Sequence, residues 1–307
     1  MKQKKRVLVI GGAGFLGSHV ADSLSEQGHE VTIYDMKKSR YLRKEQKQII
    51  GDILDEAMIN KALKGIQVVY HMAGISDIEE SFQRPVDTVK FNILGTTIIL
   101  EACLKNKIEK FLFASSAYVY SDSGSFYRIS KQACELIIEG YAEKGNLPYV
   151  ILRYGSLYGE RADRRNSIFR MLEDALTTGK ISYAGDGSEK REFIHVKDAA
   201  DLSVEALQDR YNGQNLILTG VDSINYSELL KMLNEMMHGK LKIEFKKNKS
   251  KTHYALTPYS FNPKLGRKLV TNPHIDLGQG LLNMISQIHH DLHPELKDKF
   301  GLLVNEK

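Results

Sequence analysis

The chain has 307 residues, of which 42% are hydrophobic and 26% are charged, with a formal net charge of +5. These values are typical of a soluble globular protein that buries a real core, as one large domain or two small ones. No run is long and apolar enough to span a membrane, and the basic N-terminus leads directly into a strand, so we expect neither a membrane segment nor a signal peptide.

The first predicted element is a short strand, residues 5–10, followed by a glycine-rich turn and a helix that carries Val20 and Leu24 on its apolar side. Glycines leave out side chains where the backbone must approach a ligand. The helix N-terminus offers free N–H groups and a positive dipole end, which suit a pyrophosphate. Strand, glycine turn and helix in this order indicate a dinucleotide site. Its candidate residues are Gly11, Gly14, Phe15, Leu16 and Gly17.

The second predicted strand, residues 31–34, is closed by Asp35. A carboxylate at this point accepts hydrogen bonds from the adenosine ribose and repels a 2′-phosphate, which favours NAD over NADP. Lys37 and Lys38 lie close by and weaken that preference. The alternative is a tight strand–helix turn of another α/β protein, in which Asp35 is an ordinary strand-end residue.

Two further strands are predicted to end at the same edge of the sheet. Asp52 and Ile53 follow the third strand, where the adenine could sit, although Asp52 could equally cap the helix that starts near Asp55. Small residues follow the fourth strand, residues 68–71, and again allow a close backbone approach. These cofactor candidates are Met72, Ala73 and Gly74.

A long helix over residues 85–106 and a fifth strand over residues 111–114 continue the alternation. Strands separated by helices in this way predict right-handed βαβ units and a parallel sheet.

The next stretch carries candidate chemistry: Ser116, then Tyr127 and Lys131. Residues four apart on a helix stack on one face. A phenol normally titrates near pH 10, and an adjacent ammonium lowers that value. A serine hydroxyl at the neighbouring strand end can hydrogen-bond the same substrate oxygen. The three residues therefore predict a general acid/base that takes a proton from a carbinol while hydride leaves the carbon.

With these motifs the chain resembles an extended short-chain dehydrogenase/reductase, of the NAD-dependent epimerase/dehydratase family that acts on nucleotide sugars. The resemblance runs from about residue 5 to about residue 290. The matching segments are 11–17, Asp35, 51–53, 71–74, Asn92 with 95–96, 115–120, Tyr127 with Lys131, 152–154, 185–188 and 191–198.

The resemblance implies a Rossmann-like, doubly wound parallel sheet with a smaller C-terminal α/β substrate domain. Residues 1–154 would bind NAD, with 188–222 returning to that domain. Residues 155–187 and 223–307 would form the smaller nucleotide-sugar-binding domain. Helices 85–106 and 127–144 resemble those through which the family dimerises, so a homodimer is expected.

The resemblance also implies roles for single residues. Ser116, Tyr127 and Lys131 would be catalytic, and Lys131 would also hold the nicotinamide ribose. Further NAD contacts would come from Tyr127, Asn92 and Tyr154. The substrate would be bound by Ser76, Ser116, Ser156, Asn166, Tyr183 and Arg191. Arg191 would grip a phosphate in a bidentate way; the alternative is a surface charge beside Glu189 and Glu192.

Departures from the family pattern bear on the reaction. Ala117 and Tyr118 stand where the 4,6-dehydratases carry Asp-Glu, which argues against dehydration. The segment from Ser116 to Tyr127 is shorter than usual, so the sugar site is expected to be more open or to take a bulkier sugar. Gly155 and Ser156 stand where the family commonly has an aromatic residue and then Asn, so one substrate contact is expected to differ.

The second half is less regular. Helices are predicted over 168–176, 199–207, 227–237 and 277–292, and short strands over 181–183 and 241–245. Three histidines near the C-terminus lack a carboxylate or thiol pattern, so we expect no metal; they are His289, His290 and His293. Candidates for a second basic substrate contact are His253, Lys264 and Arg267.

Charge and cysteine content bear on partners and compartment. The basic stretch 246–251 is short and typical of a solvated loop, so no nucleic-acid partner is expected. Cys103 and Cys134 fall in helical patterns and are interpreted as buried thiols rather than a disulfide framework. A reducing, cytoplasmic setting is the expected localisation.

The leading functional hypothesis is an NAD-dependent nucleotide-sugar oxidoreductase that acts at C4 of the sugar. Return of the hydride to the other face of the 4-keto sugar would make it a 4-epimerase. Release of the product would make it a net 4-dehydrogenase or 4-keto reductase. A non-catalytic NAD-binding protein of the same fold is the alternative from another class.

Overall fold

The computed structural model describes residues 4–221 and 223–246. Its strands are β1 Arg6–Ile10, β2 Glu30–Asp35, β3 Lys47–Ile50, β4 Val68–His71, β5 Lys110–Ser116, β6 Tyr149–Tyr154, β7 Ser156–Tyr158, β8 Lys180–Ala184, β9 Lys190–His195, β10 Gln214–Leu218, β11 Ser223–Asn225 and β12 Lys242–Lys246. Its helices are α1 Phe15–Glu26, α2 Glu56–Ala62, α3 Ile78–Gln83, α4 Pro85–Thr88, η1 Val89–Leu94, α5 Gly95–Lys105, η2 Ala117–Tyr120, α6 Ser125–Gly145, α7 Ser167–Thr178, α8 Val196–Glu205, η3 Asp209–Tyr211 and α9 Tyr226–Met236.

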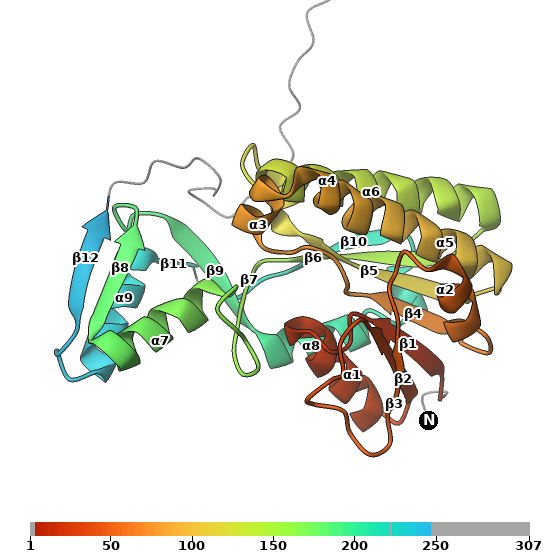
Figure 1. Ribbon diagram of the computed structural model, residues 1–307, viewed down its shortest axis with the longest axis horizontal. Helices are drawn as coiled ribbons and strands as arrows, with labels where there is room; N and C mark the ends of the chain where they lie inside the picture. Colours follow the sequence, from red (N-terminus) through yellow and green to blue (C-terminus); the bar gives the residue numbers. More distant parts are fainter. Residues whose placement is uncertain (1–3, 222, 247–307) are drawn as a thin grey trace, which may run out of the picture. The chain divides into compact units, whose positions relative to one another are not determined.

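Seven strands form one sheet in the order β10-β6-β5-β4-β1-β2-β3 (Figure 1). Every neighbouring pair in it is parallel. The chain starts in the middle with β1, proceeds to β2 and β3 on one side, and then continues from β4 on the other. The reversal of strand order between β1 and β4 is a topological switch point. In doubly wound sheets, ligands bind at the carboxyl ends of the strands next to this point. The predicted Rossmann-like fold class is confirmed.

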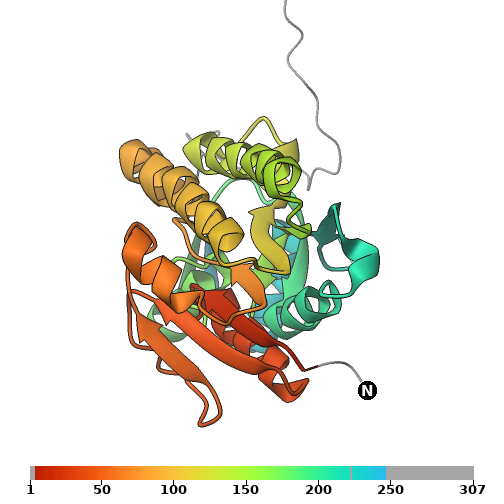
Figure 2. The ribbon, with the colours of Figure 1, turned by 90° about the vertical axis from the view of Figure 1, so that its right-hand side faces the viewer.

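Both faces of this sheet are buried. Successive residues of β1 point to opposite faces, and the residues on both faces are apolar. Val7 and Val9 pack on one side with residues of α1 and α8, whereas Leu8 and Ile10 pack on the other with residues of α2, α5 and α6. Figure 2 shows α5 (gold) and α6 (yellow-green) side by side along one side of the sheet. The two cores hold the strand ends, and hence the candidate site, in fixed register.

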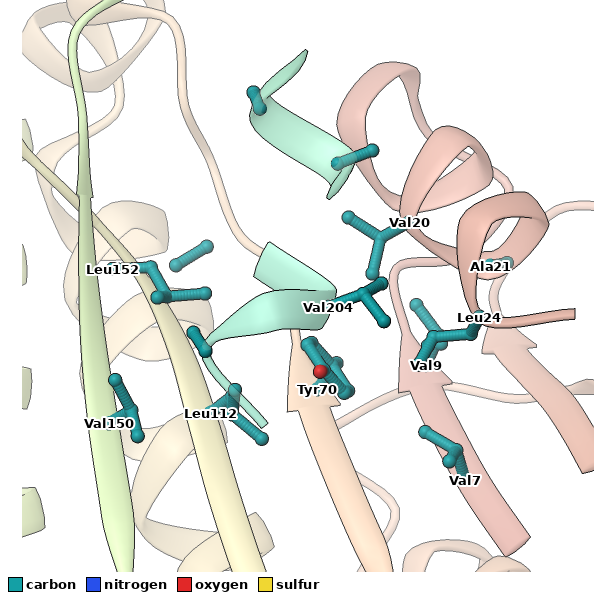
Figure 3. Packing of buried hydrophobic residues seen from close by; sticks show 14 of the residues in the cluster. Val7, Val9, Val20, Ala21, Leu24, Tyr70, Leu112, Val150, Leu152 and Val204 are labelled. Atoms are coloured by element: carbon teal, nitrogen blue, oxygen red, sulfur yellow. The ribbon is translucent and has the colours of Figure 1, made fainter. Parts of the chain in front are cut away.

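Tyr70 of β4 lies in the core on the α1/α8 side, close to Val204 (Figure 3). Its ring is fully buried, and its hydroxyl donates a hydrogen bond to the Ser203 carbonyl over 3.0 Å. A buried phenol needs such a partner, because an unpaired hydroxyl in the core would cost free energy. The bond ties β4 to α8.

The helix predicted over residues 85–106 is continuous but not uniform. Its middle turn, Val89–Leu94, is π-helical and lies between α4 and α5. π-Helical turns occur mostly inside α-helices and often near functional sites. This one carries Asn92, and spacing alone gave no sign of it.

One alternative reading of the sequence is wrong. Asp55, not Asp52, caps α2, since its carboxylate accepts a hydrogen bond from the Met58 N–H over 2.9 Å. The Asp52 carboxylate instead accepts a hydrogen bond from the Leu54 N–H over 3.0 Å in the turn after β3.

Two small sheets are formed by the remaining strands: β11-β9-β7, and the parallel pair β12-β8, which packs with α7 and α9. Strand β10 belongs to the seven-stranded sheet. The predicted domain division reaches beyond the described residues and stays a prediction. The same holds for the helix 277–292 and for the histidines and basic candidates named after residue 246.

Cys103 and Cys134 are buried free thiols, as predicted. Within the described ranges, no helix has the length and apolar character needed to cross a bilayer. Over the same residues, no cluster of three or more His, Cys, Asp or Glu side chains could hold a metal ion.

Candidate active site

The glycine turn after β1 forms a close-packed cradle. Gly11 has a φ of +84°, and a Cβ there would lie 2.6 Å from the Ala73 backbone nitrogen. A Cβ on Gly17 would collide with the Gly11 carbonyl oxygen. Helix α1 begins at Phe15 behind Gly14, and no side chain in the described chain caps it. Its first N–H groups are therefore left for a ligand, and the cradle fits the pyrophosphate of NAD.

Asp35 is fixed against this cradle. One carboxylate oxygen accepts a hydrogen bond from the Ala13 N–H over 3.1 Å, and the other accepts one from the Lys37 N–H over 3.0 Å. Each oxygen has a further lone pair, so the carboxylate can still accept hydrogen bonds from ribose hydroxyls. The structure thus brings together the glycines and the acidic residue that the sequence singled out.

The third and fourth strands supply the next two candidate segments. Ile53 is 7% exposed and packs against Gly95, where a Cβ would come within 2.7 Å of it. Met72 and Ala73 are partly buried directly after β4, and Ala73 abuts Gly11. Both segments border the glycine cradle or its supporting core, as expected of the adenine and ribose side of a dinucleotide site.

Asn92 holds the loop after β4. Its side chain is buried; the Oδ1 accepts a hydrogen bond from the Ile75 N–H over 2.7 Å, and the Nδ2 donates to the Ile75 carbonyl over 3.0 Å. The Nδ2 also donates to the Ser130 Oγ over 2.9 Å. Both amide hydrogens are thus used within the protein, and Asn92 ties the loop at Gly74 to helix α6. A direct contact of Asn92 with NAD stays a prediction.

Tyr127 and Lys131 lie together on the buried face of α6. The Lys131 Nζ is 5.9 Å from the Tyr127 ring centroid and 4.7 Å from that of Phe113. It donates a hydrogen bond to the Ala114 carbonyl over 2.7 Å. Ser116 ends the same strand, β5, and its hydroxyl accepts a hydrogen bond from the Tyr118 N–H over 3.2 Å. Lys131 thus contacts β5 two residues before Ser116, and Tyr127 lies one helical turn before Lys131 on the same buried face of α6.

Burial is the main cause of the pKa shifts of the ionisable groups around Lys131. Burial lowers the pKa of Lys131, whereas Cys134 and Glu135 act to raise it. Burial also lowers the pKa of His71, at the end of β4, to about 3, with a smaller effect from the Lys131 charge. His71 is therefore neutral at physiological pH, and its Nε2 lies 2.9 Å from the Thr96 Oγ1. The imidazole adds no second positive charge beside the Lys131 ammonium.

Tyr154 is buried in the core at the end of β6, with its hydroxyl 2.6 Å from the Ser203 Oγ. That hydroxyl is turned toward α8. Burial raises its pKa. The contact of Tyr154 with NAD that the family resemblance implied stays a prediction, and its polar end is engaged elsewhere.

The candidate substrate residues lie on several elements. Ser76 is exposed in the loop after β4, and Ser156 is partly buried in β7. Asn166 caps α7: its Oδ1 accepts hydrogen bonds from the Ile168 and Phe169 N–H groups over 3.0 and 3.1 Å. Its Nδ2 donates to the Leu157 carbonyl over 2.7 Å.

Arg191 of β9 is 5% exposed, so its reading as a surface charge is wrong. Its guanidinium lies 5.6 Å from the Tyr226 ring and donates a hydrogen bond to the Lys190 carbonyl over 2.8 Å. Tyr183 of β8 packs 4.6 Å from the same ring and donates to Glu189 over 3.0 Å. Arg191 and Tyr183 are thus brought to one aromatic cluster.

Two charged residues near the trio received no role from the sequence. Glu135 lies one helical turn after Lys131, and Arg153 lies in β6; they form an ion pair of 2.6 Å. The i, i+4 spacing from Lys131 to Glu135 was the available signal. The partner in β6 became evident only from the fold.

The seven-stranded parallel sheet, with a glycine cradle after β1 and an acidic residue at the end of β2, is typical of a Rossmann-type dinucleotide-binding domain. Residues 7–218 match the NAD dependent epimerase/dehydratase family, and the chain belongs to that family. The predicted family, enzyme class and cofactor, NAD, are confirmed.

Similar proteins include the UDP-N-acetyl-alpha-D-glucosaminuronate decarboxylase of Bacillus cytotoxicus, 32% identical over 78% of this chain and 83% of that protein. The putative UDP-glucose 4-epimerase of Methanocaldococcus jannaschii is 29% identical over 91% of this chain and 97% of that protein. Among solved structures, the UDP-glucuronic acid 4-epimerase from Bacillus cereus, in complex with UDP-glucuronic acid and NAD, has a TM-score of 0.72. It is 26% identical and covers 83% of this chain and 88% of that one.

Proposed function

We propose that the protein is a nucleotide-sugar 4-epimerase that oxidises C4 of the sugar to a ketone and then returns the hydride. The observation that carries the proposal is the buried Tyr127–Lys131 pair of α6, whose Lys131 Nζ reaches the Ala114 carbonyl near the end of β5. The names of the relatives support it, since they include 4-epimerases of UDP-sugars.

Each residue of the trio has a task in this reaction. The Tyr127 phenolate accepts the proton of the C4 hydroxyl, and the Lys131 ammonium beside it stabilises that phenolate. The Ser116 hydroxyl, at the end of β5, hydrogen-bonds the same sugar oxygen. NAD, when bound, supplies the hydride acceptor. The 4-keto sugar then rotates in the site, so that the hydride returns to its other face. In that step the Tyr127 phenol gives its proton back to the C4 oxygen.

Substrate binding is assigned to the second group of residues. Arg191 pairs with a phosphate of the nucleotide diphosphate, because a guanidinium grips phosphate oxygens in a bidentate way. Asn166, Tyr183, Ser76 and Ser156 complete the contacts to the nucleotide sugar. The uncapped cradle at α1 and the Asp35 carboxylate bind NAD in preference to NADP.

A second candidate is decarboxylation of a nucleotide-linked uronic acid, which the 32% identical relative favours by its name. It shares the first step, because a ketone at C4 lies β to a C5 carboxylate and makes the loss of CO₂ easy. The two candidates therefore share the oxidation of C4 at Tyr127 and differ only in the fate of the 4-keto sugar.

The test is to incubate the purified protein and NAD with a panel of UDP- and dTDP-hexoses, N-acetylhexosamines and uronic acids, and to follow sugars by NMR and NADH by absorbance. Epimerisation without accumulated NADH is the expected result. Release of CO₂ from a uronic acid establishes the second candidate. A released 4-keto sugar with stoichiometric NADH identifies a net dehydrogenase, and no turnover on any sugar contradicts the proposal.

The proposal includes a homodimer through the helix over residues 85–106 and through α6. Apolar side chains are exposed there, among them Leu136 at 69% and Val86 at 77%. We expect Leu136→Asp to convert a dimer into a monomer in light-scattering chromatography, because it places a charge in the apolar interface. Leu202→Asp, at a 43% exposed position of α8 on the other side of the sheet, is the control and should leave the dimer intact. A monomeric wild-type protein contradicts the assignment.

A further inference from the structure

A buried polar network joins four elements around the candidate trio. The Arg153 Nε donates to one Glu135 oxygen over 3.0 Å, and its Nη2 donates to the other over 2.6 Å. The Ser115 hydroxyl also donates to Glu135, and Arg153 donates to the Tyr120 hydroxyl. The network thus connects α6, β6, η2 and the end of β5.

The ion pair at the centre of this network is largely removed from water. The side chains of Arg153 and Glu135 are only 12% and 8% exposed. A buried ion pair adds little net stability, because desolvation offsets the attraction between the charges. Stability alone therefore gives little reason for a carboxylate and a guanidinium at this place.

Their position relative to the trio gives another reason. Tyr127, Lys131 and Glu135 follow one another at four-residue intervals on α6, so they share one face of that helix. Ser115, which hydrogen-bonds Glu135, directly precedes Ser116. The carboxylate is thus tied both to the helix of the acid/base pair and to the strand end that carries the serine.

The surroundings of the Lys131 ammonium contain few charges. From β5 it meets the Ala114 carbonyl and the Phe113 ring, and from β4 it faces neutral His71. From its own helix it faces the Tyr127 ring and two groups that favour its charged form. These groups are Cys134 and Glu135; burial raises the pKa of the Cys134 thiol, which keeps that thiol neutral. Among the residues that the structure describes, Glu135 is thus the negative charge that offsets the burial of Lys131.

We infer that Glu135 and Arg153 are positioning residues for the acid–base step: their ion pair aligns β5 with α6, and the Glu135 carboxylate keeps Lys131 charged. Arg153 in turn weakens the effect of that carboxylate on Lys131, because the guanidinium partly neutralises the negative charge. The inference rests on the proposed function, since it assigns these residues to the same reaction.

The test is the pH profile of kcat/KM for Glu135→Gln, which keeps the shape and removes the charge. The acid limb reports deprotonation of Tyr127, and the alkaline limb reports loss of the Lys131 proton. Without the carboxylate, the Lys131 pKa falls further, and the alkaline limb should move by about one pH unit toward neutrality. Glu135→Asp should restore most of the wild-type profile.

Arg153→Gln is expected to act in the opposite direction. It leaves the Glu135 charge unshared, so the alkaline limb should move to higher pH while kcat falls through lost alignment. Asp209→Asn is the matched control: it removes an equally charged partner from Lys110 at the other end of β5, where the ion pair is 2.9 Å. Its profile should coincide with that of the wild type. Equal losses of activity in the Glu135 and Arg153 variants with unmoved limbs would overturn the inference.

A readout independent of turnover separates this inference from the proposed function. NMR titration of protein labelled at the lysine side-chain nitrogen, with the Lys131 signal assigned through Lys131→Arg, should show a lower pKa in Glu135→Gln. If that shift occurs but no nucleotide sugar is turned over, the effect of Glu135 on Lys131 is real and the proposed reaction fails. If the sugar is turned over and the Lys131 pKa does not shift, the positioning role fails alone.

Discussion

Replacing Tyr127 with phenylalanine is expected to lower turnover of the nucleotide sugar by about 1,000-fold, within the range of general acid–base catalysis. The variant loses the group that accepts the C4 proton, but it keeps the ring that packs 5.9 Å from the Lys131 Nζ. NAD should therefore bind with nearly wild-type affinity. Steady-state kinetics measure the loss of turnover, and calorimetry measures NAD binding.

Tyr141→Phe provides the control on the same helix. Tyr141 lies at the far end of α6, where Lys144 sits 5.1 Å over its ring. Its hydroxyl has no part in the proposed reaction, so kcat/KM should stay within about two-fold of wild type, the size of effect seen at distant surface sites. Turnover retained by Tyr127→Phe would show that another group removes the proton, and the catalytic assignment would be wrong.

The sequence predicted the framework of this site well, because its signals are local. The glycines at 11, 14 and 17 fall in one strand–turn–helix unit, and Tyr127 and Lys131 share one helix face. A parallel sheet then places the ends of its strands at one edge without further information. Local patterns of this kind determine which segments meet, and the seven-stranded order confirms the fold they predicted.

The contacts that the sequence left open depend on partners far apart in the chain. Asn92 binds Ile75 and Ser130, and Glu135 pairs with Arg153; neither partnership follows from spacing. The π-helical turn that carries Asn92 likewise has no periodic signature. Such contacts are selected by packing among elements, which overrides single-residue preferences.

The ambiguity at Asp52 had a different origin. Both Asp52 and Asp55 are good helix caps by residue type, and only the backbone conformation decides between them. Asp55 has extended φ and ψ and receives the Met58 N–H, so α2 begins one residue later, at Glu56. Boundaries of elements are therefore less predictable than their existence.

Gly17→Ala should have a large effect for a change of one methyl group. Alanine normally stabilises a helix relative to glycine. At position 17, however, the added Cβ would meet the Gly11 carbonyl oxygen, which is backbone and cannot rotate away. Relief of this clash must push α1 away from the glycine turn. We expect a loss of about 3 kcal/mol in the free energy of unfolding, the upper part of the usual range for overpacking.

NAD binding should suffer with it, because the same shift moves the helix N-terminus away from the pyrophosphate. Losing one hydrogen bond to the charged pyrophosphate costs about 1.5–3 kcal/mol, which lowers the affinity for NAD by roughly 10- to 100-fold. Calorimetry gives the affinity for NAD, and urea unfolding of the free protein gives the stability.

Gly140→Ala is the matched control, since it is the same substitution inside a helix. A Cβ at Gly140 meets nothing within 4 Å. This variant should gain up to about 1 kcal/mol of stability from helix propensity and bind NAD as the wild type does. The opposite signs of the two variants result from the backbone of Gly11 and Gly12, which crowds the buried position 17, whereas position 140 is exposed. If Gly17→Ala were as stable and as tightly bound to NAD as Gly140→Ala, the glycine cradle could not be closely packed, and the pyrophosphate would have to bind elsewhere.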